Sequence, residues 1–282
     1  MRRYSLAHLT VAELDPLDVV QCAKDTGYDF ADLRLIGVVA TDRHYPVFGD
    51  TPMRRDLIRR LDDTGMRIFD IELIKIVEDT RASQFEALLE TAAAIGASRV
   101  KAAAYCADMS YVADVLADLC RLAAPYGLVI DLEFMPFSNV KTATAAQALV
   151  RRAGAKNIGV LVDALHLSRS GGSVAEVRGL DASLLGYMHL CDAPVAIPPT
   201  LAAIIEEARL GRMFPGEGGL PLVELIAALP QDLTVSIELP MKHLVASVPP
   251  LERARHARLA AAKVVSQADA LRIAQDSLAI PS

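Results

Sequence analysis

The chain alternates eight short apolar runs with Ala- and Leu-rich amphipathic segments, and this alternation constrains the fold more than any other feature. Most of the runs are continuously apolar, which is typical of parallel strands buried on both faces. The predicted strands span residues 4–9, 30–35, 67–76, 99–105, 128–135, 158–166, 185–192 and 234–239. Eight such repeats without a break in composition predict the α/β class and a single (β/α)8 TIM barrel.

The segments between these runs carry the residues that begin and end helices. Pro16 begins and Gly27 ends the first of them, as these residues favour helix termini. The predicted helices span residues 15–26, 52–64, 83–95, 110–124, 144–153, 222–229 and 251–273. We expect the barrel to occupy residues 1–275, followed by a C-terminal tail over residues 276–282. An open doubly wound sheet is the alternative, but it usually has a glycine-rich loop after its first strand, and residues 8–13 contain no glycine.

Composition argues against several classes of protein. Hydrophobic residues make up 52% of the chain, which is too many for a disordered protein. The 29 basic and 35 acidic residues give a net charge of −6 without a basic stripe, so no nucleic-acid partner is expected. No run approaches the ~20 apolar residues of a membrane span, and the N-terminus lacks the apolar core of a signal peptide. The scattered cysteines are typical of a reduced, cytoplasmic protein, namely Cys22, Cys106, Cys120 and Cys191.

Ionisable residues end the last four predicted strands. Glu133, Asp163, His189 and Glu238 each follow an apolar run, and the strands of a parallel barrel all end on one face. A buried carboxylate is costly unless it is paired, hydrogen-bonded or bound to a metal ion. Three carboxylates and one imidazole without thiolates suit one divalent ion, Mn²⁺, Mg²⁺, Co²⁺ or catalytic Zn²⁺, of which we favour Mn²⁺. Any one of these residues alone could be a helix cap, but four on consecutive strands predict a metal site.

Three long connections, residues 36–51, 193–219 and 240–250, follow the second, seventh and eighth predicted strands. The active sites of such barrels are built from the loops after the strands, so these connections are candidates for substrate contacts. Arg34 precedes the first of them, where it either contacts an anionic substrate group or is an ordinary exposed arginine. Further residues that could line the cavity are His8, Glu72 and Lys101.

A set of short motifs identifies a family resemblance. The motifs are Leu132-Glu133-Phe134 with Pro136, Val162-Asp163-Ala164-Leu165-His166, His189-Leu190-Cys191-Asp192, Arg212 with Pro215-Gly216-Glu217-Gly218, and Ile237-Glu238. As a set they resemble the xylose-isomerase-like α/β-barrel superfamily, and within it the sugar phosphate isomerase/epimerase branch. The resemblance covers most of the chain and is strongest over residues 128–240.

The resemblance implies roles for individual residues. Glu133, Asp163, His189 and Glu238 would bind one divalent metal ion, and Glu133 and Glu238 would also act as the acid/base pair. His166 and Arg212 would contact substrate oxygens. The chain departs from many relatives at position 191, where they carry lysine, which places one substrate or supporting contact in doubt.

Two of these assignments have alternatives. Asp192 either supports a neighbouring group of the site or caps a loop. Arg212 alternatively forms a surface ion pair with Glu206 or Glu207, or pairs with Glu217 in the turn that follows it.

Together these features predict a metal-dependent isomerase or epimerase of a small keto-sugar or polyol-derived hydroxy-ketone, active in carbohydrate metabolism. Moving a proton beside a carbonyl needs a base, an acid and stabilisation of the enediolate, which two carboxylates and a metal ion supply. The same site could run a lyase reaction of the dehydroshikimate or inosose dehydratase type, and a non-catalytic ligand-binding barrel is a further alternative. An apurinic-site endonuclease is disfavoured by the acidic charge and the six histidines. A homodimer or homotetramer is compatible with the apolar composition.

Overall fold

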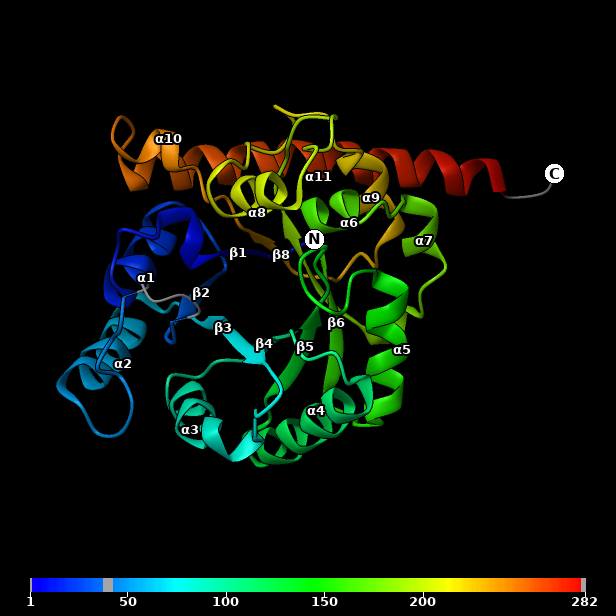
Figure 1. The fold of residues 1–282 in the computed structure, drawn as a ribbon. Helices are drawn as coiled ribbons and strands as arrows, with labels where there is room; N and C mark the ends of the chain where they lie inside the picture. Colours follow the sequence, from blue (N-terminus) through cyan, green and yellow to red (C-terminus); the bar gives the residue numbers. More distant parts are fainter. Residues whose placement is uncertain (1, 38–42, 280–282) are drawn as a thin grey trace.

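The strands β1 to β8 form a closed barrel in which each strand pairs in parallel with its neighbours in sequence, and β8 pairs with β1. The computed structural model describes residues 2–37 and 43–279, and Figure 1 shows the helices arranged around the strands. The strands are β1 Tyr4–Leu6, β2 Phe30–Arg34, β3 Ile68–Ile76, β4 Arg99–Ala104, β5 Val129–Glu133, β6 Ile158–Asp163, β7 Leu185–Leu190 and β8 Val235–Ile237. The predicted (β/α)8 barrel is confirmed.

The helices are α1 Pro16–Asp25, α2 Pro52–Thr64, α3 Glu86–Ala94, α4 Met109–Ala123, α5 Ala143–Ala153, α6 Ala164–Arg169, α7 Val174–Arg178, α8 Leu201–Leu210, α9 Leu222–Ala228, α10 Lys242–Val245 and α11 Pro250–Ala279. Short 3-10 helices span His8–Val11, Ala82–Phe85, Ala124–Tyr126 and Ala182–Leu184. Local signals set the helix ends. The Asp15 side chain accepts a hydrogen bond from the Asp18 amide at the start of α1, and Gly65 ends α2 with φ +67°.

Several predicted boundaries differ from the structure, and two of them concern the site and the C-terminus. The sixth strand ends at Asp163 rather than at residue 166, because the Asp163 side chain accepts the His166 amide at 2.8 Å and so begins α6. The last helix continues to Ala279, so residues 276–279 are helical although a tail was expected from residue 276. Residues 280–282 lie outside the described part, and the domain range 1–275 stays a prediction.

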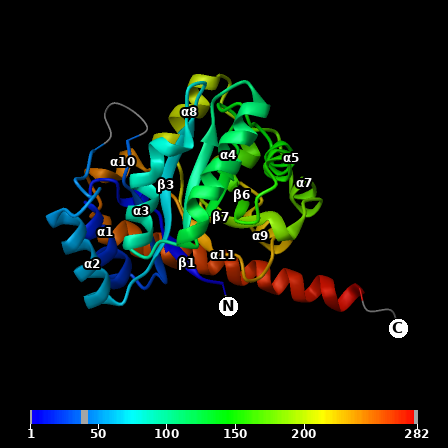
Figure 2. The same ribbon diagram turned by 90° about the horizontal axis from the view of Figure 1, so that it is seen from below.

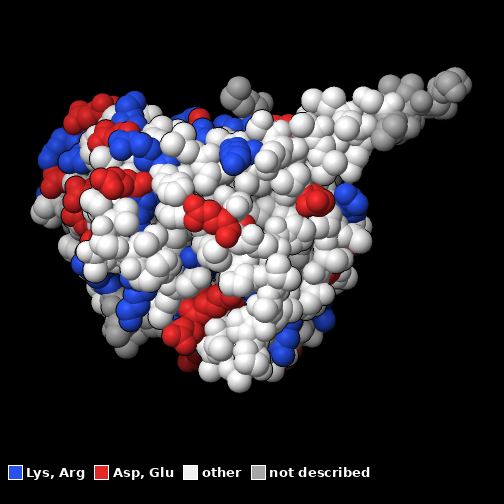
Figure 3. All heavy atoms as spheres, turned by 90° about the horizontal axis from the view of Figure 1, so that it is seen from above, with Lys and Arg blue, Asp and Glu red and all other residues white. Residues whose placement is uncertain are grey.

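Helix α11 runs along one side of the barrel, and its C-terminal end projects past the other helices in both ribbon views (Figures 1 and 2). Within the described residues, no helix is both long enough and apolar enough to cross a membrane. Acidic and basic side chains lie next to one another on the face shown in Figure 3, so this face carries no continuous basic stripe.

Candidate metal centre and catalytic pocket

The carboxyl ends of four neighbouring strands bring the predicted ligands to one place. Glu133 ends β5, Asp163 ends β6, His189 lies in β7 and Glu238 directly follows β8. Asp163 and His189 are direct neighbours across the β6–β7 pair. All four side chains are buried, with at most 3% of their surface exposed. The barrel therefore buries three carboxylates and an imidazole together at the end where its strands terminate.

The ring of His189 is the meeting point of these side chains. Its Nδ1 atom lies 3.5 Å from Glu133 Oε1, 3.5 Å from Glu238 Oε1 and 3.7 Å from Asp163 Oδ2. Within the described part of the chain, neither ring nitrogen of His189 has a hydrogen-bond partner, and Glu133 Oε1 has none either. Unpaired buried polar atoms cost free energy and need an explanation. A divalent cation held by these oxygen and nitrogen atoms fits the donor set, which contains no thiolate.

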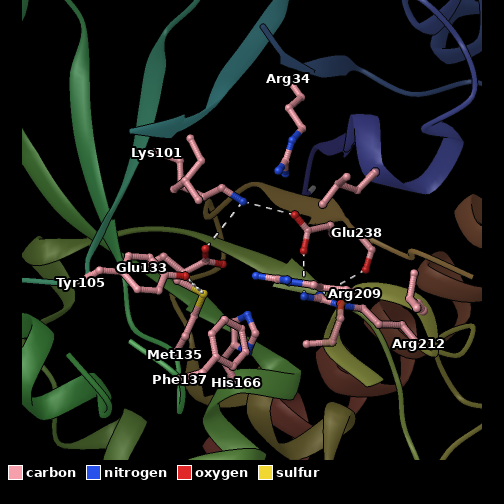
Figure 4. Close-up of a pocket in the computed structure, with 14 residues that line it drawn as sticks. Arg34, Lys101, Tyr105, Glu133, Met135, Phe137, His166, Arg209, Arg212 and Glu238 are labelled. Carbon is pink, nitrogen blue, oxygen red and sulfur yellow. Dashed lines mark hydrogen bonds and ion pairs between the residues drawn. The ribbon is translucent and has the colours of Figure 1, made fainter. Parts of the chain in front are cut away.

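Two buried cations pair with the same carboxylates. Arg212 lies with Nη1 2.7 Å from Asp163 Oδ2 and Nη2 2.9 Å from Glu238 Oε2. Lys101, from β4, places Nζ 3.2 Å from Glu238 Oε1 and 3.7 Å from both Glu133 Oε2 and Glu72 Oε2. Figure 4 shows Lys101 reaching toward Glu133 and Glu238. The site is therefore a closed ionic network rather than a set of separate ion pairs.

This network keeps the carboxyl groups ionised. Burial alone would raise their pKa values, but Lys101 lowers the pKa of Glu133, and Arg212 holds the pKa of Asp163 well below its usual range. His189, Lys101 and Arg212 likewise lower the pKa of Glu238 against its burial. Burial opposes the charged form of His189, but the carboxylate of Glu238 and the nearby carboxylates of Asp163 and Glu133 raise its pKa to about 10. The cluster thus attracts positive charge strongly at its centre.

A cavity of about 340 Å³ opens onto this cluster (Figure 4). Its polar floor is formed by Lys101, Glu133, His166, Arg212 and Glu238, and Arg34 and Arg209 also line it. The remaining lining residues are Leu9, Leu73, Tyr105, Met135, Phe137, Ala208 and Leu210. A small concave site with apolar walls and a few convergent polar groups is the usual form of a small-molecule site.

The predicted substrate contacts lie at this cavity. His166, in the first turn of α6, is buried and packs edge-on against Phe137 with the ring centroids 5.3 Å apart. Its Nδ1 has no partner among the described residues, and burial lowers its pKa, which favours the neutral ring. Arg34 lines the same cavity, with Nη1 3.9 Å from Glu72 Oε2.

The alternative surface pairings of Arg212 are wrong. Arg212 is 2% exposed and pairs with Asp163 and Glu238. Glu207 instead pairs with Arg169, and Glu217 with His256.

Asp192 acts on a loop. Its side chain accepts hydrogen bonds from the amides of Ala193, Gly216 and Leu220, at 2.8, 2.9 and 3.0 Å. Its backbone also pairs with Met213, next to Arg212. The described contacts of the Asp192 side chain join it to this loop and not to the metal-binding candidates, as the loop-cap alternative describes, and its support of a neighbouring group of the site stays a prediction. Asp192 therefore acts on the site indirectly, because it holds the loop that carries Arg212.

A second layer of carboxylates lies beneath the cluster. Asp32 accepts hydrogen bonds from Ser5 and Ser236, each at 2.5 Å. Asp32, Glu72 and His189 each offer one donor atom, and these atoms lie within 4.8 Å of one another. Burial raises the pKa of Asp32 to about 6, although both serine hydroxyls oppose this. His189 therefore lies near the carboxylates of Asp32 and Glu72 as well as near those of the cluster.

Sequence reasoning missed or undervalued several residues of this cavity. Lys101 was named only as a lining candidate, although a lysine inside the apolar run of β4 was a usable signal for a charged partner nearby. Tyr105, Phe137 and Arg209 were not singled out, because aromatic and arginine residues near strand ends and on helices are common and carry no spacing signal.

Comparison with known proteins agrees with this geometry. Residues 20–263 match the protein family described as xylose isomerase-like TIM barrel. An inosose isomerase of Halalkalibacterium halodurans is 27% identical over 173 residues, which cover 56% of this chain and 58% of that protein. A 3-dehydroshikimate dehydratase of Pseudomonas aeruginosa is 31% identical over 121 residues, which cover 43% of this chain and 18% of that protein.

The aligned part thus spans little more than half of the isomerase and a small part of the dehydratase. Among solved structures, that of IOLI protein with a bound zinc atom superposes with a TM-score of 0.79 at 20% identity, covering 94% of this chain and 98% of that one. The likeness to that structure concerns the fold. With its barrel topology and a family match over most of its length, the chain belongs to the xylose isomerase-like TIM barrel family.

Proposed function

We propose that the protein is a divalent-metal-dependent isomerase or epimerase of a small keto-sugar or polyol-derived hydroxy-ketone. The observation that carries the proposal is the convergence of Glu133, Asp163 and Glu238 oxygens on Nδ1 of His189 at the floor of a cavity. The partial similarity to inosose isomerase supports the same reaction class. Glu133, Asp163, His189 and Glu238 would hold the ion.

Glu133 and Glu238 are suited to proton transfer because each has two differently placed oxygens. In each, Oε1 faces His189, while Oε2 of Glu133 faces Lys101 and Oε2 of Glu238 faces Arg212. A glutamate that binds the ion through one oxygen keeps the other for general acid/base work. One glutamate would take a proton from the carbon beside the carbonyl, and the other would return one. When bound, the ion polarises the carbonyl and stabilises the enediolate charge.

His166 and Arg212 would orient the substrate in this scheme. His166 offers an unpaired ring nitrogen at the cavity wall. Arg212 holds Asp163 and Glu238 in place and also borders the cavity, so it contributes both position and positive charge. Arg34 would contact a more distant part of the substrate.

The finer assignments are part of the same proposal. We favour Mn²⁺, because three carboxylate oxygens and one imidazole nitrogen suit it. A role in carbohydrate metabolism follows from the hydroxy-ketone substrate class. Four buried cysteines without disulfides in the described residues support a cytoplasmic location. We also propose a homodimer or homotetramer.

A second candidate is a lyase reaction in which proton removal is followed by loss of a β-hydroxyl group. The partial similarity to 3-dehydroshikimate dehydratase favours it. The same two glutamates would serve, one as the base and the other as the acid that protonates the leaving hydroxyl. Loss of 18 mass units from the substrate would identify this reaction, whereas isomerisation keeps the formula.

The test of the proposal is hydrogen exchange in D₂O with the metal-loaded protein and a panel of keto-sugars and cyclic hydroxy-ketones. We expect the wild-type protein to incorporate one deuterium beside the carbonyl. We expect Glu133→Gln and Glu238→Gln not to incorporate it. Arg121→Met, an exposed position on α4, is the matched control. Exchange that persists in both glutamine variants would overturn the assignment of the acid/base pair.

A further inference from the structure

The lining of the cavity includes more cationic than anionic side chains. Four of its lining residues are cationic, namely Arg34, Lys101, Arg209 and Arg212, whereas two are anionic, namely Glu133 and Glu238. Asp163 and Glu72 lie directly behind this lining and are in ionic contact with Arg212 and Lys101.

The charges of the floor balance once a divalent ion is counted. The carboxylates of Glu72, Glu133, Asp163 and Glu238 carry four negative charges. Lys101, Arg212 and one divalent ion carry four positive charges. Below and above this layer, Asp32 and Arg34 add one charge of each sign. The positive charge of Arg209 is therefore not required to balance the carboxylates at the floor of the cavity.

Arg209 stands apart from this balanced set. It is the penultimate residue of α8, it is exposed, and it lines the cavity (Figure 4). Within the described part of the chain it forms no ion pair, unlike the buried Arg212 three residues later. Tyr105 lines the same cavity, and the charge of Arg209 opposes the rise that burial and Glu133 cause in the pKa of Tyr105.

The apolar part of the cavity lining strengthens the effect of the charge on Arg209. Leu73, Met135, Phe137 and Leu210 line the same cavity as its charged groups. Charges interact more strongly across such apolar surroundings than across water. A guanidinium that lines a partly apolar cavity is suited to a carboxylate or phosphate, which it can bind through two hydrogen bonds.

We infer that the substrate carries an anionic group, and that Arg209 binds this group while the hydroxy-ketone end faces Glu133 and Glu238. The inference rests on the proposed function and narrows its substrate class. It favours a carboxylated or phosphorylated hydroxy-ketone over a neutral polyol ketone. Arg209 is a binding and specificity residue in this scheme, separate from the acid/base pair.

The experiment measures binding of three probes to the Mn²⁺-loaded protein by calorimetry at low and moderate salt. The probes are 3-dehydroshikimate, with a carboxylate, D-ribulose 5-phosphate, with a phosphate, and the neutral 2-keto-myo-inositol. We expect one anionic probe to bind about tenfold or more tightly than the neutral one, as for one charge-assisted contact. Which anionic probe binds more tightly identifies the anion.

Variants then assign the preference to Arg209. We expect Arg209→Met to lose the preference for the anionic probe while binding of the neutral probe stays within about twofold. Arg209→Lys should keep part of the preference, and Arg121→Met should keep all of it. Equal binding of charged and neutral probes by the wild-type protein, or an undiminished preference in Arg209→Met, would overturn the inference.

Hydrogen exchange in D₂O separates this inference from the proposed function. In one outcome, the neutral probe exchanges at the same rate in wild type and Arg209→Met, and neither anionic probe exchanges. This outcome would support the proposed reaction and refute the inference that the substrate is anionic. A preference for an anion that depends on Arg209, without exchange of any probe, would support the anion site and refute the proposed reaction.

Discussion

Replacing Arg212 by methionine should destabilise the metal-free protein strongly and the metal-loaded protein much less. In the wild type, the buried guanidinium lies 2.7 Å from Asp163 Oδ2 and 2.9 Å from Glu238 Oε2. Removing one partner of a buried ion pair typically costs about 3–5 kcal/mol, because the other charge stays buried without compensation. A bound divalent ion compensates the same carboxylates. At a thousandfold excess over its Kd it adds about 4 kcal/mol of stability to any protein that binds it.

The assay is urea unfolding of wild type and Arg212→Met, each in EDTA and in excess Mn²⁺. We expect a loss of about 3–5 kcal/mol in EDTA and a clearly smaller loss with Mn²⁺. Arg121→Met, which removes an exposed pair with Asp118, should change stability by less than about 1 kcal/mol in either buffer. A loss below about 1 kcal/mol for Arg212→Met in EDTA would refute the reasoning.

The same variant should change the acid dependence of stability. Arg212 lowers the pKa of Asp163 well below its ordinary value of 3.8, so the carboxylate contributes stability that is present above that value. This contribution is lost as the pH falls through the lowered pKa of the folded state. Without Arg212, burial raises the folded pKa, and the loss of stability should begin at a higher pH.

Three further substitutions test other parts of the account. Glu133→Gln should reduce hydrogen exchange in D₂O by about 10²–10⁴-fold, since it removes one acid/base group; an unchanged rate would exclude it from that role. Asp32→Asn should weaken Mn²⁺ binding by about 10–100-fold in calorimetry, because it removes a negative charge close to the ligand histidine His189, and unaltered affinity would show that Asp32 does not act on His189. Gly186→Ala should cost about 1–3 kcal/mol in urea unfolding, because its Cβ would clash with Asp131 Oδ1, whose carboxylate pairs with Arg99; a stability equal to wild type would show that this ion pair can shift.

The barrel and the meeting of the four strand-end residues could be predicted from the sequence for one physical reason. Parallel strands in a closed barrel end on the same face, so residues far apart in the chain, such as Glu133 and Glu238, must lie near each other. Hydrophobic runs in the sequence indicate the strands. An ionisable residue at the end of such a run is then expected on the face where all the strands end.

The pairing of side chains inside the site was not predictable in the same way. The acidic residues close to Arg212 in the sequence suggested surface ion pairs. In the folded chain, Arg212 instead pairs with Asp163, 49 residues away. Asp163 reads as the continuation of an apolar strand, yet its side chain caps α6 and so ends β6. Arg209 and Tyr105 depend on where α8 and the end of β4 meet the cavity, which local sequence signals do not specify.

The central claim is that Glu133, Asp163, His189 and Glu238 form one site for a divalent ion. Its most direct test is calorimetric titration of metal-stripped protein with Mn²⁺, Mg²⁺, Co²⁺ and Zn²⁺, with Glu238→Gln alongside the wild type. The account predicts one bound ion per chain in the wild type, with an affinity that falls at least about tenfold in Glu238→Gln. Folded wild-type protein that binds none of these ions, or binds them equally well after the substitution, would contradict it.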